Sequence, residues 1–295
     1  MERKEDADLP SIDWGRADML IELALNEDLD TVGDVTTNSV IPEDMESRAV
    51  LRCKTDGTVV AGLPVAERVF KLVEPRLEFK AIREDGEVCN AGDEIASVEG
   101  PVRGILTGER TALNFLQRLS GIATTTSKYV QALAGSKTVL LDTRKTTPGY
   151  RNLEKYAVAV GGGANHRMGL FDRVMIKDNH RELAALGGGD NAIAWAVKRA
   201  RSQHPELEIE VEADTVEEAA QAADAGVEYI LLDNMSNEMM AEAVKVIAGR
   251  AKTEASGGIT IERLPEIGRL GVDFVSSGAL THSVKAADIS LDIEM

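Results

Sequence analysis

The sequence predicts two units: a smaller α+β unit, followed by a parallel α/β unit that we expect to form a barrel. Three observations predict this. Residues 47–98 carry short β-like runs that are interrupted by Gly and Asp. After residue 137, apolar β-like runs alternate with helical stretches, and the last four runs begin about twenty residues apart, the length of a strand, a loop and a helix. Gly-rich residues follow the later runs, which favours a barrel over an open sheet.

The composition is that of an ordinary globular protein. The chain has 295 residues, is 43% hydrophobic and carries a formal net charge of −17. The negative charge argues against nucleic acid or an anionic membrane as partner. No apolar run approaches the roughly 18 residues of a membrane span, and the charged first residues lack the apolar core of a secretory signal. Cys53 and Cys89 have no metal-like spacing, so we expect no disulfide scaffold and a cytoplasmic location.

In the first half of the chain, one helix precedes the β-like runs and one follows them. Residues 16–29 place Met19 and Leu23 at helical spacing, and we expect residues 33–42, GDVTTNSVIP, to form a loop. Four β-like runs come next: SRAVLRCK, TVVAG, LEFKAI and DEIASV. Residues 108–123, GERTALNFLQRLSGIA, have leucines at three-residue steps and predict a helix that leads into the second unit.

In the second half, the β-like runs are separated by helices with clear end signals. Thr215 with Glu218 fits a capping box, and Gly226 is expected to end that helix. Ser236 can cap the next helix, which Gly249 is expected to end. Continuous apolar strands with helical crossovers indicate a parallel sheet. The predicted strands are residues 138–142, 173–176, 207–211, 228–233, 251–256 and 273–277.

Ionisable or Gly-rich residues follow each predicted strand of this second unit. The active site of a barrel lies at the carboxyl ends of its strands, so we expect these residues to share one rim. In chain order, the candidates are Arg144 and Lys145, then Lys177, Glu212, Asp233, Ser256-Gly257-Gly258, and Ser277-Gly278. This convergence is a stronger signal than any one residue.

The candidates have two chemistries. The cationic half consists of Arg144, Lys145 and Lys177 together with His166 and Arg167, from the segment NHRMGLFDRVMIKDNH. Such a cluster in an acidic chain indicates an anionic ligand, because arginine binds carboxylate and phosphate bidentately. The acidic half consists of Glu212 and Asp233, which beside a polyphosphate ligand are suited to Mg²⁺. The serines and glycines after the last two strands are expected to hold a phosphate on backbone N–H groups.

Several long motifs resemble quinolinate phosphoribosyltransferase, also called carboxylating nicotinate-nucleotide pyrophosphorylase, over roughly residues 16–290. They are LDTRKTTPGYRNLEKYAV, GGGANHRMGLFDRVMIKDNH, ILLDN, EASGGIT, GDVTTNSV and GERTALNFLQRLSGIAT. The resemblance implies the type II phosphoribosyltransferase fold, an N-terminal α/β sandwich and an incomplete α/β barrel of six or seven parallel strands. It implies an arm over residues 1–15, a sandwich domain over 16–117, a barrel over 118–280 and a tail over 281–295 that returns to the sandwich.

The resemblance also implies an activity. Family members transfer phosphoribosyl from phosphoribosyl pyrophosphate to quinolinate with Mg²⁺, giving nicotinate mononucleotide, pyrophosphate and CO₂ in de novo NAD synthesis. By motif position, Arg144, His166, Arg167 and Lys177 would meet the quinolinate carboxylates. Members work as homodimers, some further assembled into hexamers, and Arg110 would reach in from the partner subunit.

The same carry-over assigns the remaining positions. Lys145 would face phosphoribosyl pyrophosphate, and Glu212 and Asp233 would hold Mg²⁺ or the ribose hydroxyls. The 5′-phosphate site would be lined by Ser256, Gly257, Gly258, Ser277 and Gly278.

Other interpretations stay open on the sequence. A paralogous group associated with molybdenum transport shares the fold and many of these motifs but takes a different acceptor. A Schiff-base aldolase or decarboxylase could use Lys177 as its amine, although it would not need the clustered arginines. A catalytically dead scaffold should have lost residues at the strand ends, where competent ones are found. Taken singly, each candidate also has an ordinary structural explanation, such as a solvated loop or a helix N-terminal acid.

Overall fold

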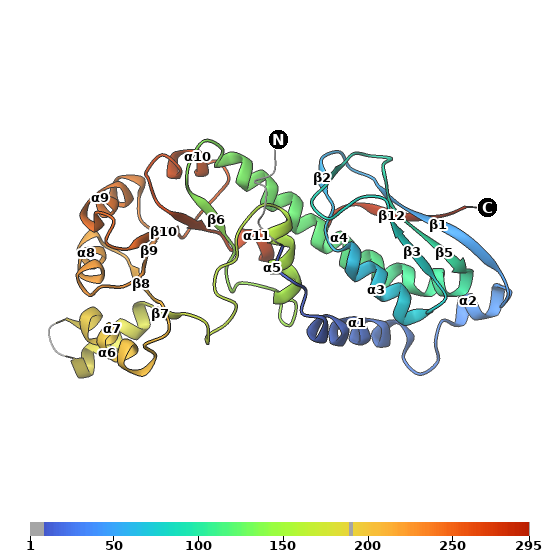
Figure 1. Ribbon diagram of the computed structural model, residues 1–295, viewed down its shortest axis with the longest axis horizontal. Helices are drawn as coiled ribbons and strands as arrows, with labels where there is room; N and C mark the ends of the chain where they lie inside the picture. Colours follow the sequence, from blue (N-terminus) through green and yellow to red (C-terminus); the bar gives the residue numbers. More distant parts are fainter. Residues whose placement is uncertain (1–8, 189–190, 295) are drawn as a thin grey trace. The chain divides into compact units, whose positions relative to one another are not determined.

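The computed structural model describes residues 9–188 and 191–294, and the chain divides into two compact units (Figure 1). The first unit comprises residues 1–127, 146–162 and 279–295, and the second comprises residues 128–145 and 163–278. The expected arm over residues 1–15 lies largely outside the described residues. In the part of the chain that the structure describes, no helix is both long and apolar enough to cross a membrane.

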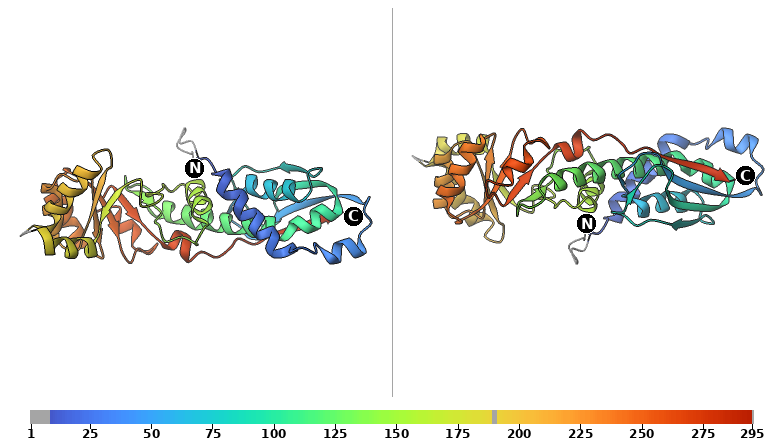
Figure 2. Two further views of the ribbon diagram at one scale, coloured as in Figure 1. Left: turned by 90° about the horizontal axis from the view of Figure 1, so that it is seen from below. Right: turned by 90° about the horizontal axis from the view of Figure 1, so that it is seen from above.

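The first unit is built on an antiparallel sheet of four strands in the order β12-β1-β5-β3, with a separate pair β2-β4. The right-hand view in Figure 2 shows β12, near the C-terminus, alongside β1, with which it pairs from Arg48↔Glu294 to Cys53↔Ile289. The strands are β1 (Glu46–Cys53), β2 (Thr58–Val59), β3 (Glu78–Ala81), β4 (Val88–Cys89), β5 (Glu94–Pro101) and β12 (Ile289–Glu294). The helices are α1 (Trp14–Leu29), α2 (Val35–Val40), α3 (Leu63–Val73), α4 (Val102–Ala132), α5 (Arg151–Val160) and α11 (Ala279–His282). Helix α4 belongs to this unit up to residue 127.

Helix α2 corrects one prediction, because residues 33–42 were expected to be a loop. The side chain of Asp34 accepts a hydrogen bond from the Thr37 N–H at 2.9 Å and thereby caps a six-residue helix. Helix α4 is also longer than the predicted helix over residues 108–123. One of its charged side chains, Arg118, is paired inside the unit: it lies 2.7 Å from the carboxylate of Glu154 of α5, which is fully buried.

The second unit contains a fully parallel sheet in the order β6-β11-β10-β9-β8-β7. The strands are β6 (Val139–Leu141), β7 (Val174–Ile176), β8 (Ile209–Ala213), β9 (Tyr229–Asp233), β10 (Lys252–Ser256) and β11 (Phe274–Ser276). The helices between them are α6 (Asp178–Gly188), α7 (Ala192–Gln203), α8 (Val216–Asp224), α9 (Asn237–Ile247) and α10 (Leu264–Ile267). Because β6 and β7 form the two ends of the strand order, the sheet is an incomplete barrel, and the predicted fold class is confirmed.

The segment before β7 extends the open edge of β6. Ala164 pairs in parallel with Leu141, its N–H donating to the Leu140 carbonyl at 2.8 Å. This pairing places the following residues, including His166 and Arg167, beyond the end of β6. The predicted helix caps are also confirmed: the hydroxyls of Thr215 and Ser236 accept from backbone N–H groups at the starts of α8 and α9.

The inner face of this sheet is unusually polar. Strand registers and the two-residue alternation put Glu210, Glu212 and Asp233 on one face, together with Glu254 and Ser256. Helix α8 packs against β8 and β9 from outside. A parallel sheet covered by helices normally shows apolar residues on both faces, so this face points to a functional interior.

Candidate active site

The second unit brings nearly all of the predicted site residues to one end of its sheet. The strands are parallel, so their carboxyl ends share an edge. Arg144 and Lys145 follow β6, Lys177 follows β7, Glu212 lies within β8, Asp233 and Ser256 end β9 and β10, Gly257 and Gly258 follow β10, and Ser277 and Gly278 follow β11. Arg110 is exposed on α4 in the first unit.

The acidic half of the site is held by a lysine. Nζ of Lys177 lies 2.5 Å from Oε2 of Glu212, whose side chain is only 8% exposed. Burial raises the pKa of Asp233; the charge of Glu212 raises it further, while Lys177 and Lys145 lower it. Lys145, Lys177 and Glu212 therefore lie within electrostatic reach of Asp233.

The cationic half brings two guanidinium groups close together. Arg167 is 8% exposed, and its Nη1 donates to the Arg173 carbonyl at 3.0 Å. Burial lowers the pKa of Arg167, and the positive charge of Arg144 lowers it further. Two like charges held together in a partly buried place form a site that a bound anion would stabilise.

The loops after β9 and β10 pack tightly against each other. The Asn234 N–H donates to the Ser256 carbonyl at 3.0 Å, and Asn234 itself adopts φ +53°. Gly257 has φ +83°, and a Cβ there would lie 2.2 Å from Oδ1 of Asn234. Only glycine fits this position without strain. The chain therefore presents a turn of small residues at the strand ends, and its use as a phosphate site stays a prediction.

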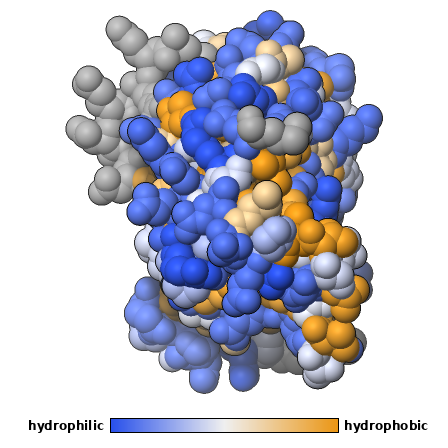
Figure 3. All heavy atoms as spheres, turned by 90° about the vertical axis from the view of Figure 1, so that its right-hand side faces the viewer, coloured by the Kyte–Doolittle hydropathy of each residue, from blue (hydrophilic) through white to orange (hydrophobic). Residues whose placement is uncertain are grey.

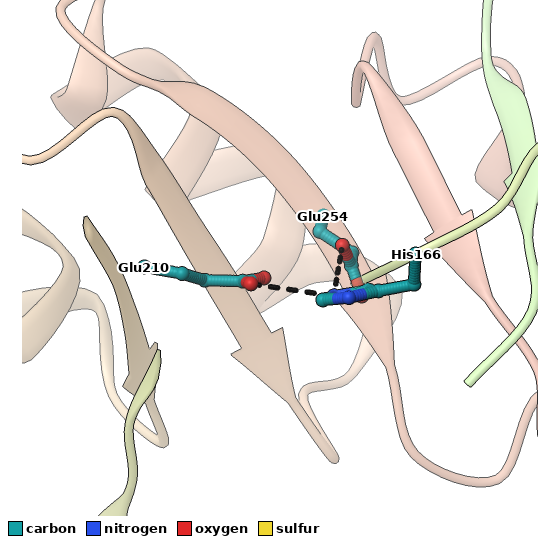
Figure 4. Close-up of side chains that lie close together, drawn as sticks. All are labelled: His166, Glu210 and Glu254. Atoms are coloured by element: carbon teal, nitrogen blue, oxygen red, sulfur yellow. Dashed lines mark ion pairs between the residues drawn. The ribbon is translucent and has the colours of Figure 1, made fainter. Parts of the chain in front are cut away.

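His166 is placed differently from the other predicted residues, because its ring points into the sheet interior (Figure 4). Its Nε2 lies 3.2 Å from Oε2 of Glu210 and 3.4 Å from Oε2 of Glu254, and both carboxyl groups are fully buried. Its backbone N–H donates to Oδ1 of Asp142 at 2.8 Å. The direct contact of His166 with a substrate carboxylate stays a prediction.

Glu210, Glu254 and Asp142 were missed by the sequence analysis. Their predicted strands were interpreted as apolar runs, so their acids received no role. The signal for Glu210 was the alternation of Glu208, Glu210 and Glu212, which puts all three on one face of a strand. Glu254 and Asp142 had no comparable local signal.

The fold and this site define a class, an α/β-barrel protein with an enzyme-like site for anionic ligands at the carboxyl ends of its strands. Comparison with known proteins goes further. Residues 34–120 and 122–292 match the N-terminal and C-terminal domains of quinolinate phosphoribosyl transferase. The chain belongs to the quinolinate phosphoribosyltransferase family.

Named relatives are similar over most of the chain. The chloroplastic carboxylating nicotinate-nucleotide pyrophosphorylase of Arabidopsis thaliana is 45% identical over 93% of this chain and 82% of its own. A probable enzyme of that name from Bacillus subtilis is 43% identical over 91% of this chain and 90% of its own. The solved nicotinate-nucleotide pyrophosphorylase of Francisella tularensis is 37% identical, with a TM-score of 0.89 over 97% of this chain and 99% of that one.

Proposed function

We propose that this protein transfers phosphoribosyl from phosphoribosyl pyrophosphate to quinolinate, with loss of one carboxyl group as CO₂, in NAD biosynthesis. Family membership and the names of the relatives support this activity. The observation in the structure that supports it is the set of three cations in the second unit: Arg144 follows β6 and is within electrostatic reach of Arg167, and Lys177 follows β7. A planar dicarboxylate is an anion that two guanidinium groups and an ammonium group can bind together.

The reaction needs such a cationic wall because both substrates are anions. Quinolinate is a dianion, and phosphoribosyl pyrophosphate is more negative, so their approach is opposed by repulsion that grows in a low-dielectric pocket. Fixed positive charges remove this penalty before the substrates arrive. Arg144, Arg167 and Lys177 would hold the pyridine ring, and Lys145 would face the phosphoribosyl pyrophosphate.

The chemistry can then proceed without a covalent nucleophile. Departure of pyrophosphate leaves an oxocarbenium-like ribose, which the pyridine nitrogen attacks. The carboxylates of Glu212 and Asp233 can stabilise that positive charge or fix the ribose hydroxyls. The alkylated nitrogen stabilises the carbanion that remains when the C2 carboxylate leaves as CO₂, and this carbon then takes a proton from water to give nicotinate mononucleotide. The protein mainly orients the substrates and excludes water.

Mg²⁺ is the metal that we propose for this site, and the donor set fits it. Glu212 and Asp233 supply carboxylate oxygens, the ligands that Mg²⁺ prefers beside substrate phosphates. When bound, Mg²⁺ neutralises charge on the pyrophosphate leaving group.

The activity is tested with purified protein, phosphoribosyl pyrophosphate and Mg²⁺, with quinolinate or nicotinate as acceptor. Turnover of quinolinate alone, with matched release of mononucleotide and CO₂, is the expected result. Turnover of neither acceptor would favour the paralogous group associated with molybdenum transport, which shares the fold. The relatives named above bear the names of quinolinate-family enzymes and do not favour that alternative.

We also propose a homodimer in which Arg110 completes the partner's site. Arg110 is exposed on α4. The first unit also exposes apolar side chains, including Met19 at 63% and Leu23 at 65%, and Figure 3 shows hydrophobic residues gathered along one side of its face. Exposed apolar patches of this kind are typical of association surfaces.

Mixed dimers of two inactive variants test the shared site. Arg110→Ala and Lys177→Ala should each abolish activity alone. If Arg110 acts in the partner's site, co-expression regenerates one intact site in each mixed dimer, or about a quarter of wild-type activity at random mixing. If Arg110 acts in its own subunit, every site in the mixed dimer carries one defect, and no activity returns.

A cytoplasmic location is proposed from the two free, buried cysteines, which suit a reducing compartment. Cell fractionation tests it, and recovery in an organelle fraction would contradict it, as the chloroplastic relative makes a real alternative.

A further inference from the structure

His166 occupies the centre of a buried cluster whose acids have no role in the proposed chemistry. Figure 4 shows its ring between Glu210, from β8, and Glu254, from β10. These strands are separated in the sheet by β9, so the ring bridges carboxyl groups from across the curved interior. His166 itself is 8% exposed, and both glutamates are fully buried. Charged groups are rarely buried to this extent unless they are paired.

The ring nitrogens show where the proton lies. The Arg167 N–H donates to Nδ1 of His166 at 2.7 Å, which requires a lone pair on Nδ1 and puts the proton of a neutral ring on Nε2. Burial lowers the pKa of His166, but the hydrogen bonds and charges of Glu210 and Glu254 outweigh burial and raise it to about 9. The amide contact favours the neutral ring and the carboxylates favour the cation, yet Nε2 carries a proton in both.

A proton on Nε2 distinguishes two possible roles of the cluster, a metal site and an anchor for the histidine ring. His166, Glu210 and Glu254 could each offer one ligand atom to a metal ion, since these atoms lie within 4.8 Å of one another. A metal ion needs a lone pair on Nε2 and so would put the proton on Nδ1, where it would oppose the Arg167 N–H. The observed contact therefore favours a held proton over a metal ion.

The two glutamates are not alone in the interior, because a second cation faces one of them. Nη1 of Arg173 lies 3.6 Å from Glu210 and helps to balance its charge.

The cluster fixes the segment that carries Arg167. Asp142, directly after β6, accepts from the His166 N–H and from the side chain of Asn165, both at 2.8 Å. From β8 and β10, the glutamates hold the His166 ring. The next residue, Arg167, then reaches the Arg173 carbonyl and lies near Arg144. Its guanidinium position therefore depends on anchors at both sides of the barrel.

We infer that Glu210 and Glu254 are positioning residues, whose buried carboxyl groups, 3.2 and 3.4 Å from Nε2 of His166, hold its ring in the barrel interior and thereby fix Arg167 for the anionic acceptor. This inference rests on the proposed function for the identity of that acceptor. It gives His166 an anchoring role for the segment that carries Arg167.

The first test needs no substrate. Long-range ¹H–¹⁵N spectra of ¹⁵N-histidine-labelled protein report which ring nitrogen is protonated, and His166→Asn identifies the His166 signals. We expect Nε2 to stay protonated from about pH 6 to about pH 8 and to lose this preference in the Glu210→Gln/Glu254→Gln double variant. An unprotonated Nε2 in the wild-type protein, or a stoichiometric metal ion that the double variant loses, would overturn the inference.

The second test uses steady-state kinetics. Glu254→Gln should raise KM for quinolinate about tenfold or more, because a displaced guanidinium binds the acceptor poorly, and should leave KM for phosphoribosyl pyrophosphate nearly unchanged. Glu208→Gln is the control, since Glu208 precedes β8, the strand of Glu210, with a side chain that is 53% exposed. Equal changes in both KM values, or none, would contradict a positioning role. The spectra remain decisive even with an acceptor other than quinolinate.

Discussion

Replacing Lys177 with methionine removes one positive charge from the site while keeping most of the side chain's length. Nζ lies 2.5 Å from Oε2 of Glu212, and Lys177 also lowers the pKa of Asp233. Lys177 is 42% exposed and Glu212 only 8%. The substitution therefore leaves a nearly buried carboxylate without its nearest cation and removes one proposed contact to the acceptor.

The structure predicts a small loss of folding stability and a larger loss of activity. Breaking a fully buried pair costs several kcal/mol and an exposed pair costs little, so with this exposure we expect a loss of stability of about 1 kcal/mol. A hydrogen bond to a charged group contributes about 1.5–3 kcal/mol, which corresponds to a fall in kcat/KM for quinolinate of about 10- to 150-fold. Activity should therefore suffer much more than folding.

The variant should also change the pH profile. Without Lys177, the pKa of Asp233 loses one of the influences that lower it and rises further. If catalysis needs ionised Asp233, the acid limb of kcat/KM moves to higher pH. The assay compares Lys177→Met with Lys198→Met, at an exposed position of α7. A kcat/KM within about twofold of wild type and an unmoved acid limb would refute the reasoning.

Three further predictions concern other parts of the molecule. Gly257→Ala should cost about 3 kcal/mol of stability by urea unfolding, since φ is +83° and the new Cβ would lie 2.2 Å from Oδ1 of Asn234. The control Gly271→Ala, with φ +84° and no described atom within 4 Å of the new Cβ, should cost about 1 kcal/mol. Equal losses in the two variants would contradict the packing argument. Glu154→Ala should cost about 3 kcal/mol, because it strips a partly buried arginine of its buried partner; a loss near zero would show that this pair is dispensable. Asp233→Asn should raise the Mg²⁺ concentration for half-maximal activity about tenfold, and an unchanged Mg²⁺ titration would remove Asp233 from the metal site.

The sequence predicts the alternation of strands and helices well, because it depends on local periodicity and caps. Strand β8 shows a limit of such prediction, because its exact bounds differ from those expected. Residues 207–211 look like an apolar run, yet the strand spans Ile209–Ala213 and includes Glu212, which was expected after it. The shift matters because it puts Glu210 and Glu212 on the same inner face. Strand ends are set by pairing with neighbours, which a single sequence does not display.

The rim residues could be predicted because each lies near the end of a strand or directly after it, and parallel strands end together. The buried anchors could not. Asp142 acts by accepting from the backbone of His166, 24 residues away. Glu254 acts by facing Nε2 of the same ring from another strand. Both depend on contacts across the sheet, and burial of an acid runs against the composition rules by which strands are recognised. The loop prediction for residues 33–42 failed for a local reason, the cap supplied by Asp34.

A crystal structure of the protein with quinolinate bound would show directly where the acceptor lies. We expect the dicarboxylate at the carboxyl ends of the strands, with its carboxylate oxygens in hydrogen-bond contact with Arg144, Arg167 and Lys177. Quinolinate bound away from these three side chains, or held mainly by groups at the other end of the sheet, would contradict this expectation.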